Sequence, residues 1–146
     1  HDADYADRAR RVSELTRDIS ELLPDLVAAL QGKLRDGTPR RLAFHPPCTL
    51  QHAQRLRGGV EKHLGTLGFD VRLAGAESQL CCGSAGTYSV LQPELATQLR
   101  ERKLSHLSPL QAEVIVSANI GCIQHLQSGT TTPVRHWVEV LDDALV

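Results

Sequence analysis

The first 38 residues follow a helical pattern of apolar positions. Apolar side chains recur there in steps of three and four, at Val12, Leu15, Ile19, Leu22, Leu26, Leu30 and Leu34. This spacing predicts an amphipathic helix from Asp4 to about Leu34 with a single apolar face. Pro24 interrupts the pattern, and proline removes a helical hydrogen bond, so we expect two helices or one kinked helix, broken near Leu23. We expect this helical arm to pack on the domain that follows, and the alternative is an arm that docks on a neighbour outside this sequence.

Beyond residue 38 the pattern alternates between strands and helices. Short apolar runs predict strands at residues 41–45, 69–74, 114–116 and 134–136. Between the first two strands, helical spacing occurs at Ala53, Leu56, Val60, Leu64 and Leu67. Another helix is expected to start at Pro93, a residue suited to a first helical turn, with its apolar face on Leu95, Leu99 and Leu104. Residues 137–145 predict a closing helix.

Strands that alternate with helices predict an α/β fold. We expect a small parallel sheet of three to four strands with flanking helices, Rossmann-like or flavodoxin-like, joined by right-handed crossovers. Turn residues at 36–39 separate this part from the arm. The chain therefore divides into a helical arm at residues 1–38 and a cysteine-containing domain at residues 39–146.

Composition and charge argue against nucleic-acid-binding and membrane-spanning proteins. The 146 residues carry 16 Lys and Arg against 17 Asp and Glu, a formal net charge of -1, which argues against a nucleic-acid-binding protein. No apolar run approaches the length of a membrane-spanning helix, about 20 residues. The start shows no leader pattern, so we expect a cytoplasmic protein without a membrane span. The sequence contains no Met, which predicts that it is part of a longer chain.

Each cysteine follows a predicted strand. Cys48 comes after the first strand, Cys81 and Cys82 after the second, and Cys122 after the third. The carboxyl ends of parallel strands emerge along one edge of the sheet, where ligands usually bind. We therefore expect the four thiols to converge, with Gly83 removing a side chain where the backbone turns.

Such a set of thiols suits several kinds of site. Four cysteines can hold an iron–sulfur cluster or a tetrahedral zinc ion. The adjacent pair Cys81 and Cys82 favours a larger multi-iron group, because neighbouring side chains point apart and zinc ligands are usually spaced by two to four residues. A redox-active dithiol and buried thiols without a ligand stay open as alternatives.

The cysteine spacing and its local motifs resemble a known family. Cys48 is followed by 32 residues, then Cys81-Cys82-Gly83 and later Cys122, a pattern similar to the cysteine-rich CCG domain. The segments HPPCTLQHAQ (45–54), CCGSAGTYS (81–89) and NIGCIQHL (119–126) resemble the C-terminal part of glycolate oxidase iron–sulfur subunits. The same domain type occurs in heterodisulfide reductase B subunits and in related lactate-utilisation and glycerol-3-phosphate dehydrogenase proteins.

The resemblance implies an electron-transfer module with no catalytic residues of its own. In that family a flavoprotein subunit, which carries FAD, oxidises the 2-hydroxy acid glycolate, and the iron–sulfur subunit passes the electrons onward. The implied partners are therefore flavoprotein subunits and a ferredoxin-like N-terminal part of the same chain. Through that complex the protein would lie peripherally at the inner face of the membrane.

The resemblance also implies a ligand set. It assigns an iron–sulfur cluster, of the 4Fe-4S type, to Cys48, Cys81, Cys82 and Cys122. Zinc is the alternative metal. The alternative functions are a structural docking module, with zinc or no metal, and a thiol redox protein.

The chain departs from the family pattern at one position. That pattern ends in a CxxC pair, whereas here Cys122 is followed three residues later by His125. His125 is a candidate fifth ligand, because imidazole replaces thiolate in some clusters. A histidine that caps a turn or faces solvent is the alternative interpretation.

Three further residues are candidates for contacts around the cluster. His45, three residues before Cys48, could donate a hydrogen bond to a cluster sulfur, with ordinary packing as the alternative. Gly83 and Ser84 directly follow the cysteine pair and are candidates for the same surroundings.

Overall fold

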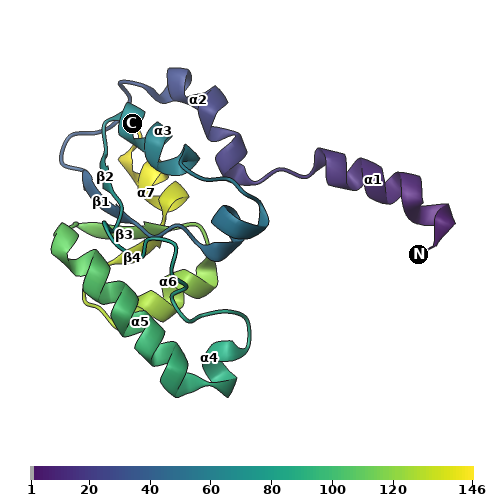
Figure 1. Cartoon of the computed structure of the whole chain (residues 1–146). Coiled ribbons are helices and arrows are strands. Elements are labelled where there is room, and N and C mark those ends of the chain that lie inside the picture. Colours follow the sequence, from purple (N-terminus) through teal and green to yellow (C-terminus); the bar gives the residue numbers. More distant parts are fainter. Residues whose placement is uncertain (1) are drawn as a thin grey trace.

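Four short parallel strands form the centre of the fold (Figure 1). The structure is a computed structural model that describes residues 2–146, so residue 1 of the predicted arm lies outside it. The strands are β1 (Arg41–Phe44), β2 (Asp70–Arg72), β3 (Val114–Ser117) and β4 (Val134–His136). They lie in the order β2-β1-β3-β4, and every neighbouring pair is parallel. The predicted α/β class with a small parallel sheet is confirmed.

Helices cover both faces of this sheet. The α-helices of the described residues are α1 (Ala6–Leu15), α2 (Leu23–Leu30), α3 (Gly59–Leu67), α4 (Tyr88–Leu91), α5 (Pro93–Leu107), α6 (Ile120–Gln127) and α7 (Trp137–Ala144). Figure 1 shows α2, α3 and α7 on one side of the sheet and α5 and α6 on the other. Within the described range, no helix combines the length and the apolar character needed to cross a membrane.

Alternate residues of the strands enter two separate cores. On β1, Leu42 and Phe44 join the core beneath α2, α3 and α7, whereas Ala43 joins the core beneath α5 and α6. This alternation follows from the strand period of two residues. The second core also contains Cys82 and Cys122. Two of the four thiols are therefore part of the packing that holds α5 and α6 to the sheet.

The helix after β1 is shorter than predicted. Val60, Leu64 and Leu67 do face the core, at 2%, 1% and 5% exposed. The prediction that Ala53 and Leu56 belong to the same helix was wrong, because Gly58 takes a left-handed φ of 76° and α3 begins only at Gly59. The preceding residues instead form a separate π-helical turn, Thr49–Ala53.

α5 presents a different face to the sheet from the one predicted. Pro93 does begin the helix. Leu95, however, is 49% exposed, and the buried side chains are Ala96, Lys103, Leu104 and Leu107. The predicted face was therefore wrong at Leu95, whereas Leu104 is buried as predicted and Leu99 is half-buried. The side chains of α5 that face the protein interior therefore include one charged residue, Lys103.

The arm breaks earlier than predicted. α1 ends at Leu15, because the next residue, Thr16, takes an extended ψ of 127°, and Asp18 then caps a short turn through a capping box with Glu21. Pro24 does not cause the break near Leu23, because it lies in the first turn of α2, where proline is tolerated. Leu23 is 1% exposed and joins the core, whereas α1 buries no side chain and extends away from the sheet in Figure 1. The division of the chain at residue 38 stays a prediction.

Candidate metal centre

All four cysteines lie beyond the carboxyl ends of the strands. Cys48 follows β1 and begins the π-helical turn, and Cys122 lies in the first turn of α6, just after β3. Cys81 and Cys82 stand in the loop between β2 and α4. The parallel topology thus brings thiols from three separate segments to one edge of the sheet.

A cavity of about 150 Å³ opens among these segments. Its walls include Cys48, Cys81 and Cys122, together with Ser84 and Asn119. Cys122 is buried, as is Cys82, whereas Cys48 and Cys81 are half-buried. The centre therefore has one side in the protein core and one side near the surface.

Ser84 joins the two buried thiols. Cys82 Sγ and Cys122 Sγ lie within 4.8 Å of each other. The Ser84 hydroxyl bridges them, accepting from Cys82 Sγ at 3.4 Å and donating to Cys122 Sγ at 3.6 Å. The predicted place of Ser84 beside the thiols is thus observed as a direct contact.

These contacts shift the pKa values of three of the thiols. The neighbouring Cys122 thiol is the largest effect on Cys82 and lowers the pKa of Cys82 far below its usual value, although burial opposes it. The same interaction, with burial, raises the pKa of Cys122. Burial raises the pKa of Cys48 to about 11. The metal-binding form of cysteine is the thiolate, so a metal centre that binds all four thiols must displace their protons.

His45 lies directly against the buried thiols. It follows β1, where its N–H donates to Val116 O at 2.8 Å and its carbonyl accepts from the Ser117 hydroxyl at 2.9 Å. The side chain is 1% exposed, and neither ring nitrogen has a hydrogen-bond partner. One ligand atom from each of His45, Cys82 and Cys122 lies within 4.8 Å of the other two. A buried imidazole without a partner is costly, so this ring points to a group bound between it and the thiols.

His125 occupies a different position. It lies on α6, one turn after Cys122, and its Nε2 is 3.1 Å from the carbonyl oxygen of Ala96 on α5. The histidine that shares the 4.8 Å group with the buried thiols is His45. The role of His125 as a fifth ligand stays a prediction, and its contact with Ala96 gives that role no support.

Gly83 is required by the path of the cysteine loop. Its φ is 95°, a left-handed conformation, and a Cβ atom at this position would overlap the carbonyl oxygen of Ala96. Its N–H donates to Cys81 Sγ at 3.3 Å. The glycine therefore lets the loop pass close to α5 while its backbone faces a thiol, in agreement with the sequence-based expectation of a tight turn.

Removing the Asn119 side chain is expected to weaken the helix that carries Cys122. Asn119 Oδ1 accepts from the N–H groups of Gly121 at 3.0 Å and Cys122 at 3.3 Å. In Asn119→Ala these donors lose that partner, so the free energy of unfolding should fall by about 1 kcal/mol, the usual cost of a lost N-cap. Chemical denaturation measures the change. Asn119→Asp keeps the acceptor and is the matched control; equal losses in both variants would contradict the capping role.

Sequence reasoning missed one residue near the centre. Lys103 is buried at 1% exposed on the inward face of α5. A signal was present in the sequence, since Ala96, Lys103 and Leu107 recur at helical spacing. It was hidden because a lysine is ordinarily assigned to the solvent-exposed face.

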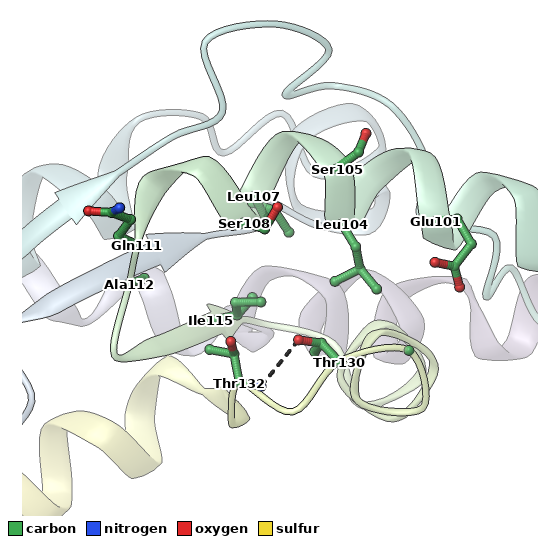
Figure 2. A pocket seen from close by; sticks show the side chains of 11 residues that line it. Glu101, Leu104, Ser105, Leu107, Ser108, Gln111, Ala112, Ile115, Thr130 and Thr132 are labelled. Atoms are coloured by element: carbon green, nitrogen blue, oxygen red, sulfur yellow. Dashed lines mark hydrogen bonds between the residues drawn. The ribbon is translucent and has the colours of Figure 1, made fainter.

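The thiol cavity is smaller than another cavity in the molecule. The larger one, about 360 Å³, lies between α5, β3 and the segment after α6 (Figure 2). Leu104, Ile115 and Thr130 line it, and the Thr132 N–H donates to Thr130 Oγ1 at 3.1 Å. No cysteine or histidine lines it. Within residues 2–146, the group of side chains spaced to hold a metal ion lies at the sheet edge.

The donor set at the sheet edge fits a thiolate-bound metal group. Four free thiols surround or adjoin one cavity, and a buried imidazole without a partner faces two of them. Soft thiolate ligands select zinc or iron–sulfur clusters over hard cations such as Mg²⁺. Burial of two of the ligand atoms keeps water away from one side of the group.

Comparison with known proteins agrees with this chemistry. The chain is 52% identical over 145 residues to the glycolate oxidase iron–sulfur subunit of Escherichia coli (strain K12), a match that covers 99% of this chain and 35% of that protein. It is 30% identical to the uncharacterized protein YkgE of the same strain, over 94% of this chain and 59% of that protein. It is also 30% identical to lactate utilization protein A of Shouchella clausii (strain KSM-K16), over 96% of this chain and 61% of that protein. The chain is thus shorter than each of these relatives.

The family itself is identified by a match to the cysteine-rich domain called CCG, over residues 42–127. This range contains β1 to α6, and with them Cys48, Cys81, Cys82 and Cys122. Because the match covers more than half of the 146 residues, the chain belongs to the CCG cysteine-rich domain family.

Proposed function

We propose that this chain is an iron–sulfur electron-transfer module of a 2-hydroxy-acid oxidase, with glycolate as the substrate of the complex. The observation that carries this proposal is the group of four thiols and one partnerless buried imidazole at the sheet edge. A soft, sulfur-rich donor set of this kind suits an iron–sulfur cluster. The similarity to a protein named glycolate oxidase iron–sulfur subunit supports the same assignment.

The proposed ligands of a 4Fe-4S cluster are Cys48, Cys81, Cys82 and Cys122. Such a cluster, when bound, supplies the transfer of single electrons. The two buried thiols would anchor its inner side, and the two half-buried thiols would keep its outer side near the surface. A position near the surface favours exchange with another protein, because electron transfer slows steeply with distance. The module performs no chemistry on the substrate itself.

His45 and Ser84 are the proposed hydrogen-bond donors to the cluster. The ring nitrogens of His45 have no other partner, and the Ser84 hydroxyl already contacts the sulfur atoms of Cys82 and Cys122. Hydrogen bonds to the sulfur atoms are one of the means by which a protein sets the reduction potential of a cluster. Because Gly83 has no side chain, the loop that carries Ser84 can lie close to the buried thiols and His45.

The proposed partners are a flavoprotein (FAD) subunit and a ferredoxin-like part of a longer chain. The flavoprotein would supply the electrons, and the ferredoxin-like part would carry further clusters. This chain spans 35% of the glycolate oxidase iron–sulfur subunit that it matches, so the complete electron path would require more protein than the chain contains. We place the complex in the cytoplasm, peripherally at the inner face of the membrane.

A structural module with zinc is the second candidate function. The spacing of one ligand atom each from His45, Cys82 and Cys122 within 4.8 Å suits a single ion, and one further thiol would complete Cys₃His, a known structural zinc set. The domain would then mainly dock the flavoprotein subunit. A thiol redox function of Cys81 and Cys82 has less support, because each of them pairs with a different cysteine rather than with the other.

Metal analysis of anaerobically purified protein tests these candidates. We expect iron and acid-labile sulfide in equimolar amounts, with a broad visible absorbance that bleaches on reduction. Stoichiometric zinc without iron or sulfide, together with failed anaerobic reconstitution, would contradict the cluster and support the zinc module. Protein that binds neither metal would leave only a docking role without a metal.

A further inference from the structure

Among the residues that the structure describes, one side chain of the Asp, Glu, Lys and Arg types is buried. It is Lys103 of α5, at 1% exposed. Its Nζ donates to the backbone carbonyl oxygens of Glu77 at 2.6 Å and Ser78 at 3.2 Å. These two residues belong to the turn that leads into Cys81 and Cys82. The ammonium group therefore lies against the loop that carries two of the proposed ligands.

The same turn is held from the solvent side by other residues of α5. The Glu77 carboxylate binds Arg102, whose Nε is 2.7 Å from Oε2, and Nε2 of His106 lies 3.0 Å from the same oxygen. Arg102 is exposed and His106 is half-buried. The carboxylate is thus committed to partners other than Lys103. Within the described part of the chain, the hydrogen bonds of Lys103 Nζ go to the two backbone carbonyl groups.

Burial of Lys103 calls for a negative charge nearby. An ammonium group held away from water is costly unless an opposite charge offsets it. Burial lowers the pKa of Lys103, and the negative groups that act against this are Cys82, Cys48, Glu77 and Cys81, in decreasing order. Because Arg102 already pairs with Glu77, the thiolates of the metal centre are the remaining counter-charge.

We propose that Lys103 is the buried counter-charge of the cysteine centre and shifts the reduction potential of the bound cluster to more positive values. This inference rests on the proposed function. One-electron reduction adds negative charge to the centre without forming or breaking a bond, and the ammonium group stabilises the reduced form more than the oxidised form. In the complex the electron would come from a reduced flavin, and in a titration it comes from dithionite.

The test compares Lys103 with a surface lysine in the complete 146-residue chain. Lys103→Met removes the charge and keeps an unbranched side chain, whereas Lys103→Gln keeps a hydrogen-bond donor for the Glu77 carbonyl oxygen. Lys62→Met, on the exposed side of α3, is the matched control. After anaerobic reconstitution with iron and sulfide, a dithionite titration followed by electron paramagnetic resonance gives the midpoint potential. Both Lys103 variants should shift it to more negative values, and Lys62→Met should leave it at the wild-type value.

The outcomes separate this inference from the function on which it rests. If the wild-type protein binds the cluster and either Lys103 variant has the wild-type midpoint potential, the counter-charge proposal is overturned. The proposed iron–sulfur function then still stands. A wild-type protein that takes up no iron and sulfide overturns the proposed function and the inference with it.

A second measurement applies if the Lys103 variants take up no cluster. The metal-free chains are then compared by thermal unfolding. The inference expects metal-free Lys103→Gln, which keeps a hydrogen-bond donor for the Glu77 carbonyl oxygen, to be at least as stable as the metal-free wild type, because the charge is needed only beside a filled centre. A lower unfolding temperature would show a purely structural lysine and overturn the inference.

Discussion

Cys82→Ser is expected to abolish iron–sulfur binding. Cys82 is 1% exposed, carries the lowered pKa of the set and contacts Cys122, Ser84 and His45. A serine hydroxyl is a hard oxygen donor that does not ionise near neutral pH, so it cannot replace a soft thiolate towards iron. Iron and sulfide contents and the visible spectrum after anaerobic reconstitution measure the loss. A variant that retains wild-type iron, sulfide and absorbance would remove Cys82 from the ligand set.

The control for this variant must bury the same hydroxyl without removing a thiol. Ala43→Ser does so, since Ala43 is fully buried in the core that also contains Cys82. It should lose some stability and keep its iron and sulfide. Loss of the cluster in both variants would mean that a buried hydroxyl alone disrupts the domain, and the result for Cys82 would then reflect folding.

Gly83→Ala is expected to be the most destabilising of the glycine substitutions in the cysteine loop. A left-handed backbone costs an alanine about 1–2 kcal/mol. The new methyl group would also overlap the Ala96 carbonyl oxygen. A backbone shift that relieves such overpacking costs about 1–3 kcal/mol more. The free energy of unfolding of the metal-free protein, from chemical denaturation, should therefore fall by about 2–5 kcal/mol.

Gly86→Ala is the matched control within the same loop. Gly86 also has a left-handed φ, of 50°, but no atom lies within 4 Å of the position that a Cβ would occupy. Gly86→Ala should therefore lower the free energy of unfolding only by the cost of the left-handed backbone, about 1–2 kcal/mol. If both substitutions lower the free energy of unfolding equally, the close approach of the loop to Ala96 does not contribute to the cost of Gly83→Ala.

The strands and the closing helix could be predicted from sequence because their signals are local. The all-apolar run at 114–116 lies on a central strand, β3, and is buried on both faces. Pro93 and the residues at 137–145 mark helix starts and faces that short-range rules describe well. The break in the arm was placed wrongly because two signals competed. The capping box at Asp18 starts a new turn, and Pro24 then fits the first turn of α2 instead of breaking a helix.

The inward face of α5 could not be predicted in the same way. Leu95 is apolar and correctly spaced, yet it is exposed, whereas Ala96 and Lys103 are buried. A helix turns inward the side chains that fit the surface opposite. At Gly83 the cysteine loop approaches the Ala96 backbone so closely that it leaves no room for a Cβ atom.

The sequence by itself determined the sheet and the approach of the four cysteines. The hydrophobic periods specify strands and helices, and parallel connection places every carboxyl end, and the residue that follows it, at one edge. The tertiary structure alone decided which polar groups complete the centre. His45 lies against the buried thiols without a partner, His125 bonds to α5, and Lys103 is buried behind the loop. The physical reason is that orientation and burial depend on packing between distant segments, which no local spacing encodes.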